Sequence, residues 1–289
     1  MRSLRTLAAA TYGEITRRPL YAILLVSFAA AIFLSKLLTL FSFYQEMQMV
    51  REMGMATITF WGFIVVLVTS GIVVTQELDD RTAVTLLAKP IRRSDFLLGK
   101  FAGLVLSLAP GMFVLAGILF LTLLMMAFPH LPLGDAEIAR RTASGSGPFA
   151  AAWGALWQNF IVKEGGVVLE GAFLCFLQGV ILAALAVSFS AFFPQAVSAA
   201  AITLLFVLGN VSGYMVASLE GLGVAPLSFA GRAAGYLLPN LGYFNLQASF
   251  SEGRIISLGY LGSTFAYAAL YVSAVLLVSC SLFRRREVR

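Results

Sequence analysis

The stretch that decides the fold is residues 76–100, which read QELDDRTAVTLLAKPIRRSDFLLGK. Charged side chains crowd this segment, whereas long apolar runs lie on both sides of it. The whole chain of 289 residues is 60% hydrophobic and only 12% charged. A soluble domain of that composition would expose large apolar patches and aggregate. The sequence therefore predicts one all-α polytopic membrane domain over residues 1–289, with residues 76–95 as a loop outside the bilayer.

Six apolar runs are long enough to cross a bilayer, which takes about 20 residues of helix. The third run contains Pro110, and a proline removes one backbone donor and can kink a helix. The third and sixth runs exceed the required length, so we expect them to tilt or to project into water. The predicted spans are Leu20–Tyr44, Ala56–Thr75, Phe96–Phe128, Val167–Phe189, Val197–Ala217 and Ile255–Phe283.

Residues 1–18 are predicted to form an amphipathic helix on the membrane surface. Leu4, Leu7, Ala8 and Ile15 recur with helical spacing, and the arginines of this segment lie largely off that stripe. Pro19 fits the turn into the first span.

The distribution of Lys and Arg predicts that both termini are cytoplasmic. With that orientation, thirteen basic residues lie inside and six lie outside, while Lys36 falls within the first span. The inner set is Arg2, Arg5, Arg17, Arg18, Arg81, Lys89, Arg92, Arg93, Lys100, Arg284, Arg285, Arg286 and Arg289, and the outer set is Arg51, Arg140, Arg141, Lys163, Arg232 and Arg254. Because these residues flank the spans, topology and anionic lipids explain the net charge of +6, and no nucleic-acid partner is expected.

Two longer outer segments are predicted. Residues 129–166 form the longest polar interruption of the chain. Residues 218–254 are too apolar for a plain loop, yet glycines and prolines break them. Short helices that dip into the outer leaflet would explain this mixture, provided that protein covers their broken backbone.

The charged loop has the composition of a short helix bounded by charge. Leu86 and Leu87 lie on one side of the predicted helix, Pro90 ends it, and Ser94 or Asp95 can cap the helix that follows. Such a unit is a compact attachment point for a soluble domain. The alternative is an ordinary inner loop whose arginines only fix the orientation of the spans.

The string ELDDRTAVTLLAKPIRRSDFLLGKF (residues 77–101) resembles the coupling loop of ABC-2 type permeases, the membrane subunits of ATP-driven exporters. The basic amphipathic start, the six spans, LLPNLGYFN at Leu237–Asn245 and the arginine-rich end are similar to that family in outline. The resemblance implies that the ATPase-coupling residues are Glu77, Asp79, Asp80, Arg81, Thr82, Leu86, Leu87, Pro90, Arg92 and Arg93.

The chain has no phosphate-binding loop of its own. Gly99 and Lys100 are followed by Phe101, so the G-x-x-x-x-G-K-[ST] pattern is absent. The resemblance then implies a separate ABC ATPase subunit that binds the ATP, and a second permease, either another copy of this chain or a sister subunit. It implies the cytoplasmic (inner) membrane as the location, no cofactor in this chain, no enzymatic activity of its own and no particular substrate.

Small residues in the fifth span leave two interpretations open. Gly209, Gly213 and Ala217 recur at four-residue intervals, which lets helix backbones approach closely. They are candidates for a contact between two permease copies, and packing within one chain is the alternative.

Three further sets of residues are candidates for a role. Met47, Met49, Met53 and Met55 could bind Cu(I) or could simply fill gaps. Lys36 could serve a substrate or ion, or could extend toward the membrane surface. The only histidine, His130, cannot build a histidine-based zinc site, and Cys175 and Cys280 form no CxxC motif.

Two rival functions remain at this stage. An ion-coupled transporter or channel would need ionisable groups near mid-membrane, and those are scarce here. A membrane scaffold for assembly of another complex would use the same architecture.

Overall fold

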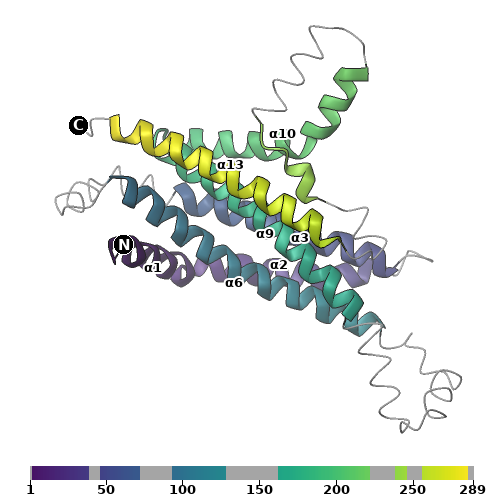
Figure 1. Ribbon diagram of the computed structural model, residues 1–289. Coiled ribbons are helices and arrows are strands. Elements are labelled where there is room, and N and C mark those ends of the chain that lie inside the picture. The colour runs from purple at the N-terminus through teal and green to yellow at the C-terminus, as the bar shows by residue number, and fades with distance from the viewer. Residues whose placement is uncertain are drawn as a thin grey trace, which may run out of the picture.

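The computed structural model describes residues 2–38, 46–71, 93–127, 162–221, 238–245 and 256–285. Every regular element in these ranges is helical, and six helices are long and apolar enough to cross a membrane. The protein is therefore an all-α, multi-pass membrane protein, as the sequence predicts. In the order of Figure 1, the elements are α1 (Arg2–Arg17), α2 (Pro19–Leu38), α3 (Glu46–Ser70), α6 (Arg93–Ala127), α9 (Lys163–Ser190), α10 (Gln195–Gly221), the 3-10 helix η5 (Leu241–Phe244) and α13 (Leu258–Arg285).

Both ends of the described chain lie at the same end of the bundle (Figure 1). We call this the terminal end; it holds the start of α1, the start of α6 and the last turn of α13. An even number of spans returns a chain to the side on which it began, so this arrangement agrees with six crossings.

Glycines bring α3 and α6 into close contact. A Cβ at Gly111 of α6 would lie 1.9 Å from the Trp61 ring, and a Cβ at Gly62 of α3 would lie 2.2 Å from Met112. Toward the opposite end, a Cβ at Gly54 would lie 2.3 Å from a Leu119 methyl group. The two helices run antiparallel and interlock along most of their length, because only glycine leaves room for these side chains.

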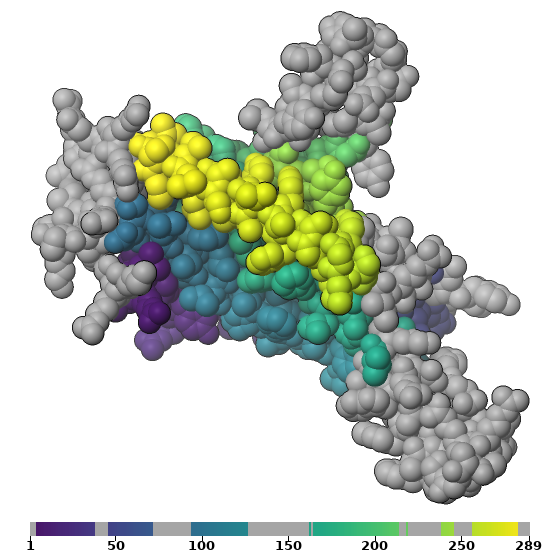
Figure 2. Space-filling view, viewed as in Figure 1, coloured from purple at the N-terminus to yellow at the C-terminus, as the bar shows by residue number. Residues whose placement is uncertain are grey.

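The central helix of the bundle is α9. It packs against α3, α6, α10 and α13, and 72% of its most apolar stretch is buried. By contrast, the equivalent figures are 11% for α2 and 22% for both α10 and α13. Helices α3, α6 and α9 therefore form the core, and the other three spans lie around it. In Figure 2, α13 covers one side of this core.

Helix α3 begins ten residues before the predicted second span, at Glu46 in place of Ala56. This early part of α3 holds an ion pair with α9: Nη2 of Arg51 donates to both carboxylate oxygens of Glu164, at 2.9 and 2.8 Å. The Arg51 side chain is only 5% exposed. Since its charge is neutralised by a partner, Arg51 can lie inside a helix that the sequence alone would start after it.

The described part of the predicted outer segment is short and well covered. In η5, Leu241 and Phe244 are buried, and the Asn240 side chain accepts a hydrogen bond from the Gly242 backbone at 3.1 Å. The Tyr260 hydroxyl donates to the Tyr243 carbonyl at 2.8 Å. Side chains thus satisfy backbone groups that an isolated short helix would leave open in a bilayer. Of the predicted segment 218–254, the structure describes only the end of α10 and residues 238–245, and the remainder lies outside the described ranges.

Candidate functional site

The predicted coupling loop lies between α3 and α6 in the sequence, and α6 starts at the terminal end. Helix α3 and its last described residue, Gly71, come before the loop, and α6 begins at Arg93 after it. Residues 72–92 lie outside the described ranges, and so do the predicted coupling residues from Glu77 to Arg92. Arg93 is placed by its backbone as the first residue of α6. The structure therefore describes the surroundings from which the loop leaves and to which it returns.

On one side, these surroundings are formed by α1, whose apolar stripe packs on the first turns of α6. A Cβ at Gly99 would lie 2.6 Å from the Leu7 side chain, and a Cβ at Gly103 would lie 2.8 Å from the Ala8 carbonyl oxygen. Ile15 is 1% exposed. A helix is thus present at Arg2–Arg17, where the sequence predicts an amphipathic one, and its apolar stripe packs on α6.

The junction of α1 with α2 is fixed to α6 as well. The Tyr21 hydroxyl donates to the Ser107 carbonyl at 2.8 Å, and the Tyr21 ring meets Trp61 edge-on, with 5.6 Å between ring centroids. Any movement of the start of α6 would therefore be passed to α1 and to the beginning of the first span.

On another side, the end of α3 meets the start of α10. A Cβ at Gly71 would lie 2.6 Å from the Gln195 side chain, so the chain after the α9–α10 turn rests directly on the last residue before the loop. Ser70 is 1% exposed. Within α6, the Lys100 amine lies 5.8 Å from the centre of the Phe96 ring and is almost fully buried, a cation–π arrangement.

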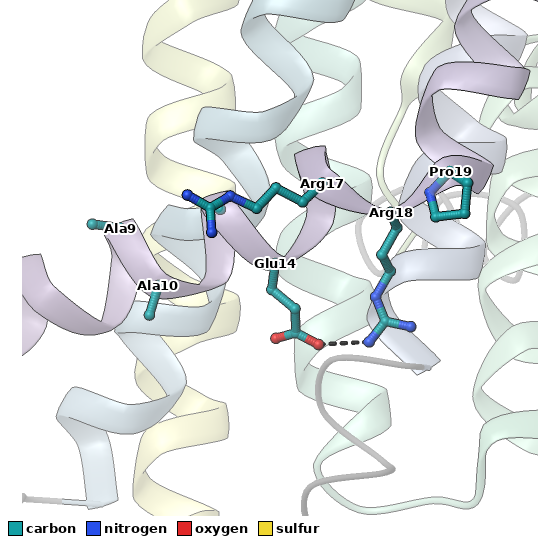
Figure 3. Close-up of a pocket in the computed structure, with 7 residues that line it drawn as sticks. Ala9, Ala10, Glu14, Arg17, Arg18 and Pro19 are labelled. Carbon is teal, nitrogen blue, oxygen red and sulfur yellow. Dashed lines mark hydrogen bonds and ion pairs between the residues drawn. The ribbon is translucent and has the colours of Figure 1, made fainter.

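The outward side of α1 is hollowed. Small residues, Ala9, Ala10 and Gly13, border a shallow depression of about 590 Å³, which ends at Arg17, Arg18 and Glu14. Nη2 of Arg18 donates to Glu14 at 2.6 Å, while Arg17 points to a different side of the helix (Figure 3). The terminal end therefore presents a smooth apolar strip with charge beside it.

Comparisons with known proteins add no relatives. No protein-family model matches this chain, and no curated protein matches it. The assignment of a function accordingly depends on the residues and on their arrangement.

Among the candidate glycines of the fifth span, Gly209 packs within the chain. A Cβ there would lie 2.8 Å from the Pro239 carbonyl oxygen and from Leu241, so η5 occupies this notch. A Cβ at Gly213 would lie 3.9 Å from the Asn240 amide, and Gly213 itself is exposed. The side chain of Ala217 lies outside what the structure describes. A contact between two copies at Gly213 and Ala217 stays a prediction.

The candidate methionines differ in how deeply they are buried. Met55 is 3% exposed in the core, and Met47 packs against that core, which is the gap-filling role. Met49 and Met53 are half-buried. Within the described ranges no group of three His, Cys, Asp or Glu side chains could hold a metal ion.

The remaining candidates have clear positions in the fold. Lys36 lies in the last described turn of α2, close to the end of the helix and away from its middle. Cys175 is buried, with its sulfur 3.1 Å from the Thr59 hydroxyl, and Cys280 is half-buried on α13. His130 lies outside the described ranges.

Three polar contacts of α9, one ion pair and two hydrogen bonds, are not predicted from the sequence. Besides the Arg51–Glu164 pair, the Glu170 carboxylate accepts from the Ile256 backbone at 2.8 Å, and the Gln178 amide donates to Asn210 at 3.4 Å. Each contact connects α9 to a different neighbour: α3, the chain just before α13, and α10. The available signal is the presence of Glu164 and Glu170 at the start of an apolar run, because a charge beside or within a span needs a partner.

Proposed function

We propose that this chain is the permease subunit of an ATP-driven exporter of the ABC-2 type, working with a separate ATPase subunit in the cytoplasmic membrane. The observation that carries the proposal is the charged segment at residues 76–100, with its acidic start, its Leu86–Leu87 pair and its double arginine. The substrate is an unidentified molecule carried outward, and two permease copies form the membrane part. In this orientation the terminal end faces the cytoplasm.

The packing of α3 and α6 supports a mechanical role for the loop between them. Gly54, Gly62 and Gly111 hold the two helices together, and α9 is bound to α3 through the Arg51–Glu164 pair. A force applied to residues 72–92 would therefore move α3, α6 and α9 as one block. Discrete rearrangement of such a rigid block is the usual vehicle of a switching transition.

The arrangement of the terminal end supports a docking surface for the ATPase. Helix α1 packs on the first turns of α6, which follow the loop, and its exposed side has Ala9, Ala10 and Gly13 as a smooth strip with Arg17 beside it. ATP binding would close the ATPase pair, and the loop would transmit that motion to the rigid block. The block, together with α1 and the beginning of α2, would then move against α10 and α13, which bury less of their surface in the core.

The decisive test is charge reversal in the loop, with a matched pair elsewhere as control. Arg92→Glu with Arg93→Glu should lower copurification of the ATPase about tenfold or more, because like charges placed in an interface cost several kcal/mol. Membrane insertion of the variant should persist. Arg140→Glu with Arg141→Glu changes an identical pair in the predicted outer loop and should leave copurification unchanged.

Equal ATPase recovery from both double variants would overturn the assignment of the loop. If no ATPase copurifies with the unchanged chain from native membranes, the proposed permease function would be wrong, and an ion-coupled transporter, a channel or an assembly scaffold would replace it.

A further inference from the structure

A cleft separates the first turns of α6 from the last turns of α13. Its volume is about 490 Å³, and it is lined by Ser94 and Leu98 of α6 and by Ser273, Leu276, Leu277 and Cys280 of α13. These two helix segments lie at the terminal end, where Figure 2 shows the yellow surface of α13 beside the blue surface of α6. The volume falls within the range of small-molecule sites in proteins, about 300–1,000 Å³.

The lining of this cleft suits a hydrocarbon chain. Leu276 is 8% exposed and forms the floor, whereas Leu277 is 71% exposed and stands at the edge. The Ser273 hydroxyl donates to the Ala269 carbonyl of its own helix at 2.6 Å, so it is satisfied without a ligand. The cleft therefore offers an apolar channel between two membrane-spanning helices, with an exposed edge at Leu277.

Two arginine positions adjoin the lining residues of this cleft along the chain. Arg284 follows Cys280 by four residues, a spacing that keeps two residues on one face of a helix, and Arg93 directly precedes Ser94. Asp95 is the one acidic residue in the first turn of α6. Basic positions beside a cleft between spans favour the headgroups of anionic lipids.

We infer that this cleft binds one anionic phospholipid from the leaflet that borders the terminal end. One acyl chain lies along Leu98, Leu276 and Leu277, and the phosphate lies beside the end of α13 that carries Arg284. This occupant uses both features of the site, an apolar channel and a basic border. A helix from a second copy would cover the channel but would have no use for the adjoining cationic residues.

The test is retention of lipid by the purified full-length chain. Nanodiscs are prepared with phosphatidylcholine and phosphatidylglycerol in equal amounts, the protein is released, and bound lipids are counted by native mass spectrometry. The unchanged chain should keep one phosphatidylglycerol in preference to phosphatidylcholine. Arg284→Gln should lower that retention about fivefold, the factor expected for the loss of one basic residue near a lipid surface. Arg17→Gln removes a cation at the same end, outside the cleft, and should leave retention unchanged.

A second pair of variants separates the cleft from the general lipid belt. Leu98→Trp fills the channel and should abolish retention, whereas Leu106→Trp places the same ring on α6 at a position that is 52% exposed and outside the cleft. Elution as a single peak in size-exclusion chromatography confirms that each variant is folded. In the unchanged chain, phosphatidylglycerol should also slow the reaction of Cys280 with a lipid-soluble maleimide, because Cys280 lines the cleft.

Several outcomes would overturn the inference. Equal retention of the two lipids would show that no headgroup is recognised. Undiminished retention in both Leu98→Trp and Arg284→Gln would place the lipid elsewhere. Slow Cys280 labelling in pure phosphatidylcholine that speeds up only on dilution of the protein would assign the cleft to a second copy of the chain.

Discussion

Removing one member of the buried Arg51–Glu164 ion pair should cost more stability than removing one member of the exposed Arg18–Glu14 pair. Removing one member of a buried ion pair usually costs about 3–5 kcal/mol, because the other charge is left without compensation. The Glu164 side chain is 19% exposed and can still reach water, so Arg51→Met should fall at the lower end, about 3 kcal/mol. The Arg51 side chain is 5% exposed, so Glu164→Leu should fall near the upper end, about 5 kcal/mol.

Thermal unfolding in detergent, followed by near-ultraviolet circular dichroism, measures these losses. A change of 1 kcal/mol shifts the midpoint of a chain of roughly this size by about 2–4 °C, so Arg51→Met should unfold about 6–12 °C earlier. The double variant Arg51→Met with Glu164→Leu should recover much of the loss, since neither charge then remains in the interior. That recovery is the coupling free energy of a double-mutant cycle.

The pair of Arg18 with Glu14 provides the control. Its two atoms are closer, at 2.6 Å, but the side chains are 38% and 35% exposed and only four residues apart along the chain. Such surface pairs contribute about 0.3–0.5 kcal/mol, so Arg18→Met should shift the midpoint by less than about 2 °C. If Arg51→Met were as stable as Arg18→Met, or if the double variant lost the sum of the single losses, the stabilising role assigned to the Arg51–Glu164 pair would be wrong.

Two more predictions concern the interior of the bundle. Gly111→Ala should destabilise the protein by about 1–3 kcal/mol, because a methyl group there would lie 1.9 Å from the Trp61 ring. Gly117→Ala meets no atom within 4 Å and should stabilise α6 by about 0.5–1 kcal/mol. The difference in unfolding midpoint between the two variants checks this, and equal midpoints would contradict the packing. A membrane-permeant thiol reagent should label Cys280 well before Cys175, because Cys175 is 4% exposed and Cys280 lines an open cleft. Peptide mass spectrometry at short reaction times measures the order in which the two thiols are labelled. Faster labelling of Cys175 would contradict its burial in α9.

The number and order of the spans could be predicted from the sequence because hydrocarbon admits only long apolar helices. All six predicted runs correspond to helices, and the boundaries differ mostly by a few residues. The start of α3 could not be predicted, because Glu46, Arg51 and Glu52 look like a loop until a partner is known. Glu164 is 113 residues away from Arg51 along the chain, and no local pattern connects the two.

The alternatives for Gly209 show a second limit of sequence reasoning. A small residue in a span indicates close approach, but it does not name the element that approaches. The structure assigns this notch to Leu241 of η5, a four-residue element that no periodicity would reveal. The ATPase-coupling role proposed for the loop rests on the sequence alone, and the structure adds the interlocked pair of helices on either side of it.

The position of α9 has a consequence for how the protein is made. This helix is the fourth span to leave the ribosome, yet the backbone amide that meets the Glu170 carboxylate belongs to Ile256, just before the last span. The 85 residues between Glu170 and Ile256 must be synthesised before that amide is made. During this time Glu170 stays in the translocon or the bilayer without this partner. Final assembly of the interior thus falls at the close of translation, and a polypeptide that stops before α13 would present an unshielded acidic side chain to the quality-control proteases of its membrane.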